Sequence, residues 1–244
     1  MQRFFLSADH INNNFIIVNG NDANHIKRSL RMSVGDKLII CDMQKNEYEC
    51  EIFSLEKESV TVNIMKSSKN DTEPIYQAYL YQALPKGDKM DYIVQKAVEL
   101  GVYSIIPFIS ERCISRPDIV SCEKKVVRWQ RIAEEAAKQC GRGIIPYVGK
   151  VLSYNDMILD AVRGELVFFC YEGDDTEKIG SIINGKYADI RFIIGAEGGF
   201  SISEVEIAHN NGMKITGLGK RILRCETASG FVLSCLAYEN ELRI

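Results

Sequence analysis

The sequence of 244 residues has little of several features that mark specialised classes of protein. No apolar run approaches the roughly 18 to 20 residues that span a bilayer, and the amino-terminal segment becomes polar too soon for the core of a signal peptide. Prolines number only five, and 46% of the residues are hydrophobic, which excludes collagen-like and largely disordered chains. We therefore expect an ordinary folded protein in the cytoplasm, with reduced thiols and no membrane association.

Short motifs that bind metals or phosphates are also missing. The eight cysteines contain no C-x-x-C pair and the three histidines lie far apart, so we expect no metal site. Neither G-x-G-x-x-G nor G-x-x-x-x-G-K-[ST] occurs, and there is no G-x-S-x-G nucleophile elbow. Nicotinamide, nucleoside-triphosphate and serine-hydrolase chemistry therefore lose support.

Charge of one sign is not in excess. Thirty basic and thirty-three acidic residues give a formal charge of −3, so contact with a nucleic acid must come from local basic patches. Two segments could form such a basic patch. One is 25–31, which is rich in lysine and arginine, and the other is the polar face of a helix expected over 122–140. Charged stripes are also common on solvated surfaces, so both interpretations stay open here.

Up to residue 66, short alternating apolar runs predict a small β-barrel or sandwich. The predicted strands cover 15–18, 37–41, 48–53 and 59–64. One or two helical turns are expected within 23–31. The segment 67–74 is polar, lacks periodicity and ends in proline, which is typical of an interdomain connection. We therefore place a first domain at 1–70 and a second at 74–244.

Beyond residue 74, strands alternate with helices, which predicts an α/β domain with a mostly parallel sheet covered by helices on both faces. The predicted strands are 76–84, 102–109, 166–170, 190–194 and 215–218, and the predicted helices are 90–100, 122–140, 202–211 and 228–242. In sheets of this kind, ligands bind at the carboxyl ends of the strands. The functional site is therefore expected in the loops that follow these strands.

The segment 193–205 is the most informative short motif. A buried strand breaks into Gly195, Gly198 and Gly199 before a helix begins, and Ser201 and Glu204 have the spacing of a capping box. Glycines let a backbone approach a ligand closely. From the glycines alone, a binding loop and a tight turn without a ligand are equally supported.

A second strand-to-helix loop spans 215–227. Two glycines end the strand, and three cations, Lys220, Arg221 and Arg224, follow within five residues. Cations so close together favour an anionic or polar partner nearby. Alternatively, Arg221 or Arg224 pairs with Glu226 or caps helix carbonyls.

Five segments, in their order along the chain, carry a family resemblance: 82–90 (QALPKGDKM), 96–101 (KAVELG), 139–142 (QCGR), 195–199 (GAEGG) and 218–228 (LGKRILRCETA). Together they resemble the RsmE family, bacterial methyltransferases of the SPOUT class that make 3-methyluridine in small-subunit ribosomal RNA. The resemblance covers nearly the whole chain. It implies a PUA-like, RNA-contacting β-barrel domain followed by a SPOUT-type α/β domain with a parallel sheet and a carboxyl-terminal trefoil knot.

The same resemblance implies partners and ligands. The methyl donor is expected to be S-adenosylmethionine, and the substrate 16S ribosomal RNA within the small ribosomal subunit. The active enzyme is expected to be a homodimer whose active site uses both subunits. Two departures from the family pattern are visible: Ala196 stands where proline is usual, which removes a constraint on φ, and Cys225 stands where threonine is common.

Site residues are also implied by the resemblance. The expected cofactor-binding residues are Cys170, Glu172, Gly195, Glu197, Gly198, Gly199, Leu218, Gly219, Ile222 and Leu223. The expected RNA-binding residues are Lys27, Arg28, Arg31, Lys86, Lys89, Arg142 and Arg221.

Methylation at N3 of uracil requires that N3 first lose its proton. We expect the permanently charged guanidinium of Arg224 to stabilise the uracil anion, and Glu226 to act as the base or to orient it. Two alternatives stay open: an RNA-binding protein of the same fold that modifies another nucleotide or lacks catalytic activity, and a nucleotide-cofactor oxidoreductase. The second would need a phosphate cradle that this chain lacks.

Overall fold

The computed structural model describes residues 1–7, 11 and 14–243, so His10 lies outside the described residues. The chain divides into two compact units. Unit 1 comprises Met1–Glu73 and Ala137–Ile145, and unit 2 comprises Pro74–Ala136 and Pro146–Ile244. Within the described residues, no helix combines the length and the apolar character that crossing a membrane requires.

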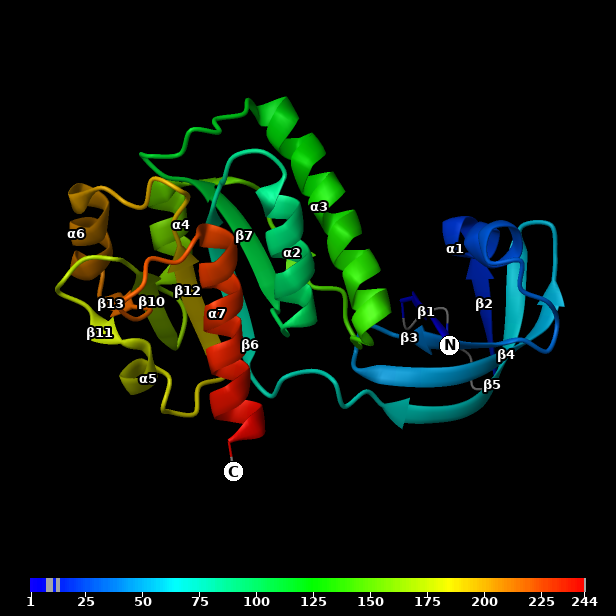
Figure 1. Cartoon of the computed structure of the whole chain (residues 1–244). Coiled ribbons are helices and arrows are strands. Elements are labelled where there is room, and N and C mark those ends of the chain that lie inside the picture. The colour runs from blue at the N-terminus through cyan, green and yellow to red at the C-terminus, as the bar shows by residue number, and fades with distance from the viewer. Residues whose placement is uncertain (8–10, 12–13, 244) are drawn as a thin grey trace. The chain divides into compact units, whose positions relative to one another are not determined.

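Unit 1 is built on a five-stranded sheet with the strand order β1-β3-β4-β5-β2 (Figure 1). The strands are β1 (Gln2–Phe5), β2 (Phe15–Asn19), β3 (Lys37–Cys41), β4 (Asn46–Leu55) and β5 (Ser59–Lys69). Neighbours are antiparallel except for β1 and β3, which are parallel. The four strands predicted from alternation are confirmed, whereas β1 is too short to show an alternating pattern.

The core of unit 1 follows directly from that alternation. Ile16 and Val18 of β2 pair with Val62 and Val60 of β5, and all four side chains are fully buried. A slip of one residue would turn each of them toward solvent, so burial fixes the register. The helical segment after β2, formed by α1 (Gly20–Asn24) and the π-helical turn η2 (His25–Ser29), covers this core with Ala23 and Ile26.

A buried ion pair joins the two chain segments of unit 1. Arg142 Nε and Nη2 donate to Glu73 Oε1 and Oε2 at 2.8 and 2.7 Å, and both side chains are only 4% exposed. Glu73 Oε1 also accepts from the backbone N–H of Gly143 at 2.8 Å. This burial contradicts our expectation that Arg142 contacts RNA, because its guanidinium is enclosed and engaged by a carboxylate of the same unit.

Unit 2 holds a parallel sheet with the order β11-β13-β10-β12-β6-β7-β8, and β9 also pairs with β7. All pairs described in it are parallel. The strands are β6 (Gln77–Ala83), β7 (Ser104–Ile109), β8 (Tyr147–Val148), β9 (Leu152–Ser153), β10 (Leu166–Cys170), β11 (Glu177–Lys178), β12 (Asp189–Ile194) and β13 (Lys214–Gly217). Because the strands are parallel, the loops that follow them meet at one edge of the sheet.

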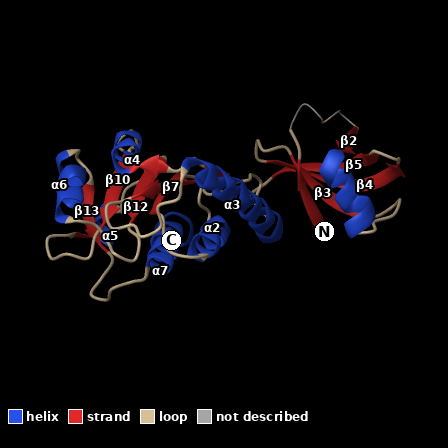
Figure 2. Ribbon diagram, turned by 90° about the horizontal axis from the view of Figure 1, so that it is seen from above, coloured by secondary structure: helices blue, strands red, loops and turns tan. Residues whose placement is uncertain are grey.

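Helices cover both faces of this sheet, as predicted. They are α2 (Lys89–Glu99), α3 (Ile119–Cys140), α4 (Tyr154–Ala161), α5 (Ile179–Ile182), α6 (Ile202–Asn210) and α7 (Cys225–Ala237), which continues into the π-helical turn η3 (Tyr238–Leu242). Helices α2 and α7 lie side by side on one face, and α4 and α6 lie on the other (Figures 1 and 2). The predicted α/β architecture is therefore confirmed.

Side-chain caps explain two differences from the predicted helices. Helix α3 begins at Ile119 rather than at 122, because the Asp118 carboxylate accepts from the backbone N–H of Ser121 at 2.8 Å. Helix α4 was not predicted, although Ser153 caps it by accepting from the N–H of Asp156. Helix α7 begins at Cys225, three residues earlier than predicted, with Arg224 as its N-cap residue.

Replacing Glu73 by Ala should lower the free energy of unfolding by about 3 kcal/mol, because it leaves the Arg142 charge buried without its partner. Urea-induced unfolding followed by circular dichroism measures this decrease. The matched control is Arg163→Ala, which breaks an exposed pair with Asp160 and should cost no more than about 0.5 kcal/mol. Equal effects of the two substitutions would contradict the assigned role of the buried pair.

Candidate cofactor and active site

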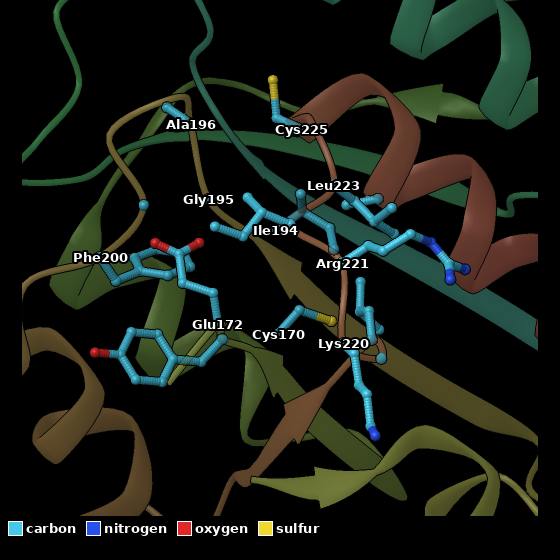
Figure 3. A pocket seen from close by; sticks show the side chains of 16 residues that line it. Cys170, Glu172, Ile194, Gly195, Ala196, Phe200, Lys220, Arg221, Leu223 and Cys225 are labelled. Carbon is cyan, nitrogen blue, oxygen red and sulfur yellow. The ribbon is translucent and has the colours of Figure 1, made fainter. Parts of the chain in front are cut away.

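A pocket lies at the carboxyl edge of the sheet in unit 2. It is formed by the loops after β10, β12 and β13 and by the first turn of α7 (Figure 3). The structure therefore brings together three loops that are far apart in the sequence. The lining includes eight of the residues expected to bind a cofactor: Cys170, Glu172, Gly195, Gly199, Leu218, Gly219, Ile222 and Leu223.

The other two expected cofactor residues, Glu197 and Gly198, are not part of the lining. Glu197 accepts hydrogen bonds from the backbone N–H of Lys86 and from the ammonium group of Lys89. Gly198 lies against Arg112, where an added Cβ would come within 3.0 Å of the Arg112 Cβ. Both residues thus support the loop from outside the pocket.

The sequence analysis missed four lining residues: Ile194, Phe200, Cys225 and Ala228. Tyr171, Ala196 and Lys220 also line the pocket, and they lie within the loops 170–173, 195–199 and 218–223 that the resemblance assigns to the cofactor. Ile194 is the last residue of a predicted strand and stands directly before Gly195. This position could have identified it as a pocket residue from the sequence. Ala228 follows Arg224 by one helical turn, so it could be placed only once the true start of α7 was known.

Aromatic packing anchors the glycine loop that follows β12. Phe200 is 2% exposed, and its ring lies 4.2 Å from that of Phe169 and 6.4 Å from that of Phe108, centroid to centroid. A Cβ on Gly195 would come within 3.1 Å of the Phe200 ring, so the close approach of loop and ring favours glycine there. The amide of Gln82 adds a further tie by donating to Gly195 O at 3.2 Å.

The end of the same loop is fixed by the predicted capping box, which is confirmed. Ser201 accepts from the backbone N–H of Glu204, and the Glu204 carboxylate accepts in return from the N–H of Ser201. Glu204 is buried and also accepts from the N–H of Glu111 at 2.8 Å. The cap therefore connects the glycine loop to the loop that follows β7.

Glu172 is the acidic side chain among the described residues that line the pocket. Figure 3 shows its carboxylate directed toward the glycine loop. Gly199 has φ +61°, and a Cβ there would lie 2.8 Å from Glu172 Oε1. Glycine is thus required at this position both by the left-handed backbone and by the nearby carboxylate. A carboxylate so placed can receive a cation or hydroxyl groups of a ligand.

Two basic residues, Lys220 and Arg221, belong to the pocket lining, and a third, Arg224, lies next to it in the chain. Lys220 and Arg221 are exposed, and Figure 3 shows both extending away from Glu172. Arg224 is exposed as well; its carbonyl accepts from the N–H of Thr227 and of Ala228, so its backbone starts α7 while its side chain is not used as a cap. Arg224 is next to the lining residue Cys225 but does not itself line the pocket.

Glu226 is held in its ionised form. Burial opposes ionisation, but hydrogen bonds from its own backbone N–H and from the Cys225 thiol, with the charges of Lys89 and Arg224, lower the pKa of this carboxyl. Conversely, burial and the bond to Glu226 raise the pKa of the Cys225 thiol to about 12, so the thiol stays a donor. A carboxylate with a lowered pKa is a poor proton acceptor at neutral pH.

The remaining residues expected to bind RNA are placed in different ways. Lys27 donates to the carbonyls of Glu56 and Lys57, both at 2.8 Å, and thereby holds the turn between β4 and β5. Arg28 and Arg31 are exposed in the same segment of unit 1. In unit 2, the side chain of Lys86 is exposed, whereas Lys89 is half-buried among carboxylates.

Comparisons with known proteins bear on both units. A family model described as an RNA methyltransferase domain matches residues 71–237, and one described as an RNA methyltransferase PUA domain matches residues 18–65. The Bacillus subtilis protein named ribosomal RNA small subunit methyltransferase E is 32% identical over 231 residues, which cover 92% of this chain and 90% of that protein. The protein of the same name from Mesomycoplasma hyopneumoniae is 32% identical and covers 96% and 98% of the two chains.

A solved structure agrees with these matches. The crystal structure of ribosomal RNA small subunit methyltransferase E from Neisseria gonorrhoeae, bound to S-adenosyl methionine, superposes with a TM-score of 0.85 at 29% identity and covers 97% of each chain. Because a family model covers more than half of the chain and relatives above 30% identity cover nearly all of it, the chain belongs to the ribosomal RNA small subunit methyltransferase E family.

Proposed function

We propose that this protein transfers a methyl group from S-adenosylmethionine to N3 of a uridine in 16S ribosomal RNA of the small ribosomal subunit. The observation that carries the proposal is the convergence of the loops after β10, β12 and β13 on one pocket with glycines at its closest approaches. The relatives' name supports the RNA substrate, and the related structure with bound S-adenosyl methionine supports the cofactor. The choice of N3 rests on the family resemblance.

The residues of the pocket fit this cofactor. Ile194, Leu218 and Leu223 offer apolar surface suited to an adenine ring, while the glycine backbone at 195 and 199 leaves room that a Cβ would fill. Glu172 offers a carboxylate to the ribose hydroxyls or to a positive group. When bound, S-adenosylmethionine supplies an activated methyl group carried on a positively charged sulfur.

In this proposal, Arg224 stabilises the negative charge that spreads over the uracil oxygens as N3 loses its proton. Its exposed guanidinium does not cap the start of α7, and Arg224 is next in the chain to Cys225, which lines the pocket. Glu226, with its lowered pKa, orients and balances the cations around it rather than serving as a strong base. The proton of N3 then passes to solvent or to a group of the RNA.

Unit 1 is proposed to hold the RNA, with the domain boundary in the connection at 70–74. The match to an RNA methyltransferase PUA domain supports this role, and the exposed Arg28 and Arg31 supply charge for phosphate contacts. Lys27 contributes by fixing the neighbouring turn. In unit 2, Lys86 and Arg221 are exposed and supply further positive charge for phosphate contacts.

The oligomeric state and the path of the chain are proposed from the family resemblance. We propose a cytoplasmic homodimer and a trefoil knot at the carboxyl-terminal end. Exposed aromatic side chains along α2 and α7, Tyr92 at 52% and Phe231 at 37%, support a contact between copies on this face. The trefoil knot rests on the family resemblance alone.

S-adenosylmethionine should raise the midpoint of thermal unfolding by several degrees, since a ligand at about 100 times its Kd stabilises the folded state by about 2.7 kcal/mol. Its demethylated product should act similarly, because most of the pocket contacts the shared nucleoside. Differential scanning fluorimetry measures the shift. Nicotinamide cofactors serve as controls, and a rise with NAD but not with S-adenosylmethionine would contradict the proposal.

Arg224→Ala should lower kcat for RNA methylation by roughly 100-fold, because it removes a positive charge that stabilises the uracil anion, while the Kd for S-adenosylmethionine stays at its wild-type value. Methyl transfer from radiolabelled donor and isothermal titration calorimetry measure the two quantities. The control is Arg163→Ala, which removes an exposed arginine that follows α4 and does not line the pocket. Wild-type turnover in Arg224→Ala would remove this residue from the mechanism.

The double variant Arg28→Ala with Arg31→Ala should bind ribosomal RNA more weakly and with a shallower dependence on salt. The slope of log K against log salt should decrease by about 0.7 to 0.9 for each phosphate that the protein no longer neutralises. Fluorescence anisotropy at several salt concentrations provides the slope. The comparison variant is Lys37→Ala, which removes one exposed positive charge from the same unit. An unchanged slope in the double variant would exclude phosphate contacts by these arginines.

A further inference from the structure

Lys89 lies between two segments of the candidate site. It is the first residue of α2, and its Nζ is 2.7 Å from Glu197 Oε1 and 3.7 Å from Glu226 Oε2. Glu197 belongs to the glycine loop after β12, and Glu226 to the first turn of α7. One ammonium group therefore contacts carboxylates from two of the segments that shape the pocket.

The backbone near Lys89 strengthens the contact with the glycine loop. The N–H of Lys86 donates to Glu197 Oε1 and Oε2 at 3.2 and 3.3 Å. This contact uses the main chain, so it does not depend on the side chain of Lys86. The loop between β6 and α2 thus holds Glu197 by a main-chain donor, and the first residue of α2 holds it by a charged side chain.

Removal of the ammonium group would leave two partly buried carboxylates facing the same space. The side chains of Glu197 and Glu226 are 29% and 19% exposed, so water screens their repulsion only in part. The nearby Cys225 thiol is neutral and supplies no compensating charge, and the guanidinium of Arg224 is exposed to solvent. The repulsion would therefore push the glycine loop away from α7.

We propose that Lys89 is a positioning residue that holds the glycine loop and the start of α7 at the separation that binds S-adenosylmethionine. The inference rests on the proposed function of the pocket. Lys89 acts through Glu197 and Glu226 and is not itself part of the pocket lining. This role differs from the RNA contact that the resemblance implied for the same residue.

Isothermal titration calorimetry with S-adenosylmethionine, in the absence of RNA, tests the proposal. Lys89→Met should raise the Kd roughly three- to tenfold, as expected for a partly exposed ion pair, while Lys89→Arg should stay near the wild type. The matched control is Lys96→Met, which removes an equal charge from the same helix and breaks the pair with Glu99 at 2.8 Å. An equal rise of the Kd in Lys96→Met would overturn the proposal.

A double-mutant cycle shows whether Lys89 acts through Glu197. The effect of Lys89→Met on the Kd should be clearly smaller in a Glu197→Gln background than in the wild type, because the partner charge is already gone. An equal effect in both backgrounds would overturn the proposal. Lys89→Gln provides the same comparison if Lys89→Met does not fold, as judged by circular dichroism.

The two proposals about this site fail in different ways. If Lys89→Met leaves the Kd for S-adenosylmethionine unchanged but weakens RNA binding, Lys89 is an RNA contact and not a positioning residue. If the wild-type protein itself does not bind S-adenosylmethionine, the proposed function fails before the role of Lys89 is addressed.

Discussion

Parallel pairing of β10, β12 and β13 is the constraint on which the candidate site depends. Phe169 is in register with Ile193 on one side and with Ile215 on the other, so the three strands end close to one another. A shift by two residues would keep the buried faces but move one loop by about 6.6 Å along the strand. Burial of these side chains therefore sets the positions of the three loops as well as the stability of the sheet.

Charges are distributed around the pocket in a way that suits two ligands of opposite character. Glu172 faces the interior, whereas Lys220, Arg221 and Arg224 are exposed around it. Lys89 balances the charge of Glu197 and Glu226 outside the lining. A positively charged donor and a pyrimidine that becomes negative during the proposed reaction would thus meet complementary groups from different loops.

Local patterns predicted most of the fold, and contacts between distant residues account for what they missed. Alternation indicated the strands of the core, and the spacing of Ser201 and Glu204 indicated the start of α6. By contrast, the resemblance implied that Arg142 contacts RNA, and only the structure brings it to Glu73, 69 residues away. The pair of Lys89 and Glu197 spans 108 residues and left no local signal either.

The start of α3 belongs to a third class, because its signal was present in the sequence. Asp118 stands three residues before Ser121, which is the spacing of a side-chain cap. The apolar periodicity placed the helix start later, at 122, because the first turn carries exposed Ile119 and Val120. Where capping and periodicity disagree, the cap sets the boundary, since it satisfies backbone donors that periodicity does not consider.

The same kind of argument applies to Ala196, where the resemblance would place a proline. A proline would limit φ at this position, and alanine removes that constraint. The loop is instead closed by a hydrogen bond from the N–H of Gly199 to Ala196 O at 3.0 Å, and Ala196 is 8% exposed. Phe200 anchors one end on the core, and Glu197 fastens the middle to Lys89. Packing and charge therefore restrict the loop through contacts that exist only in the folded state. The ring of a proline at position 196 would also have restricted the unfolded chain.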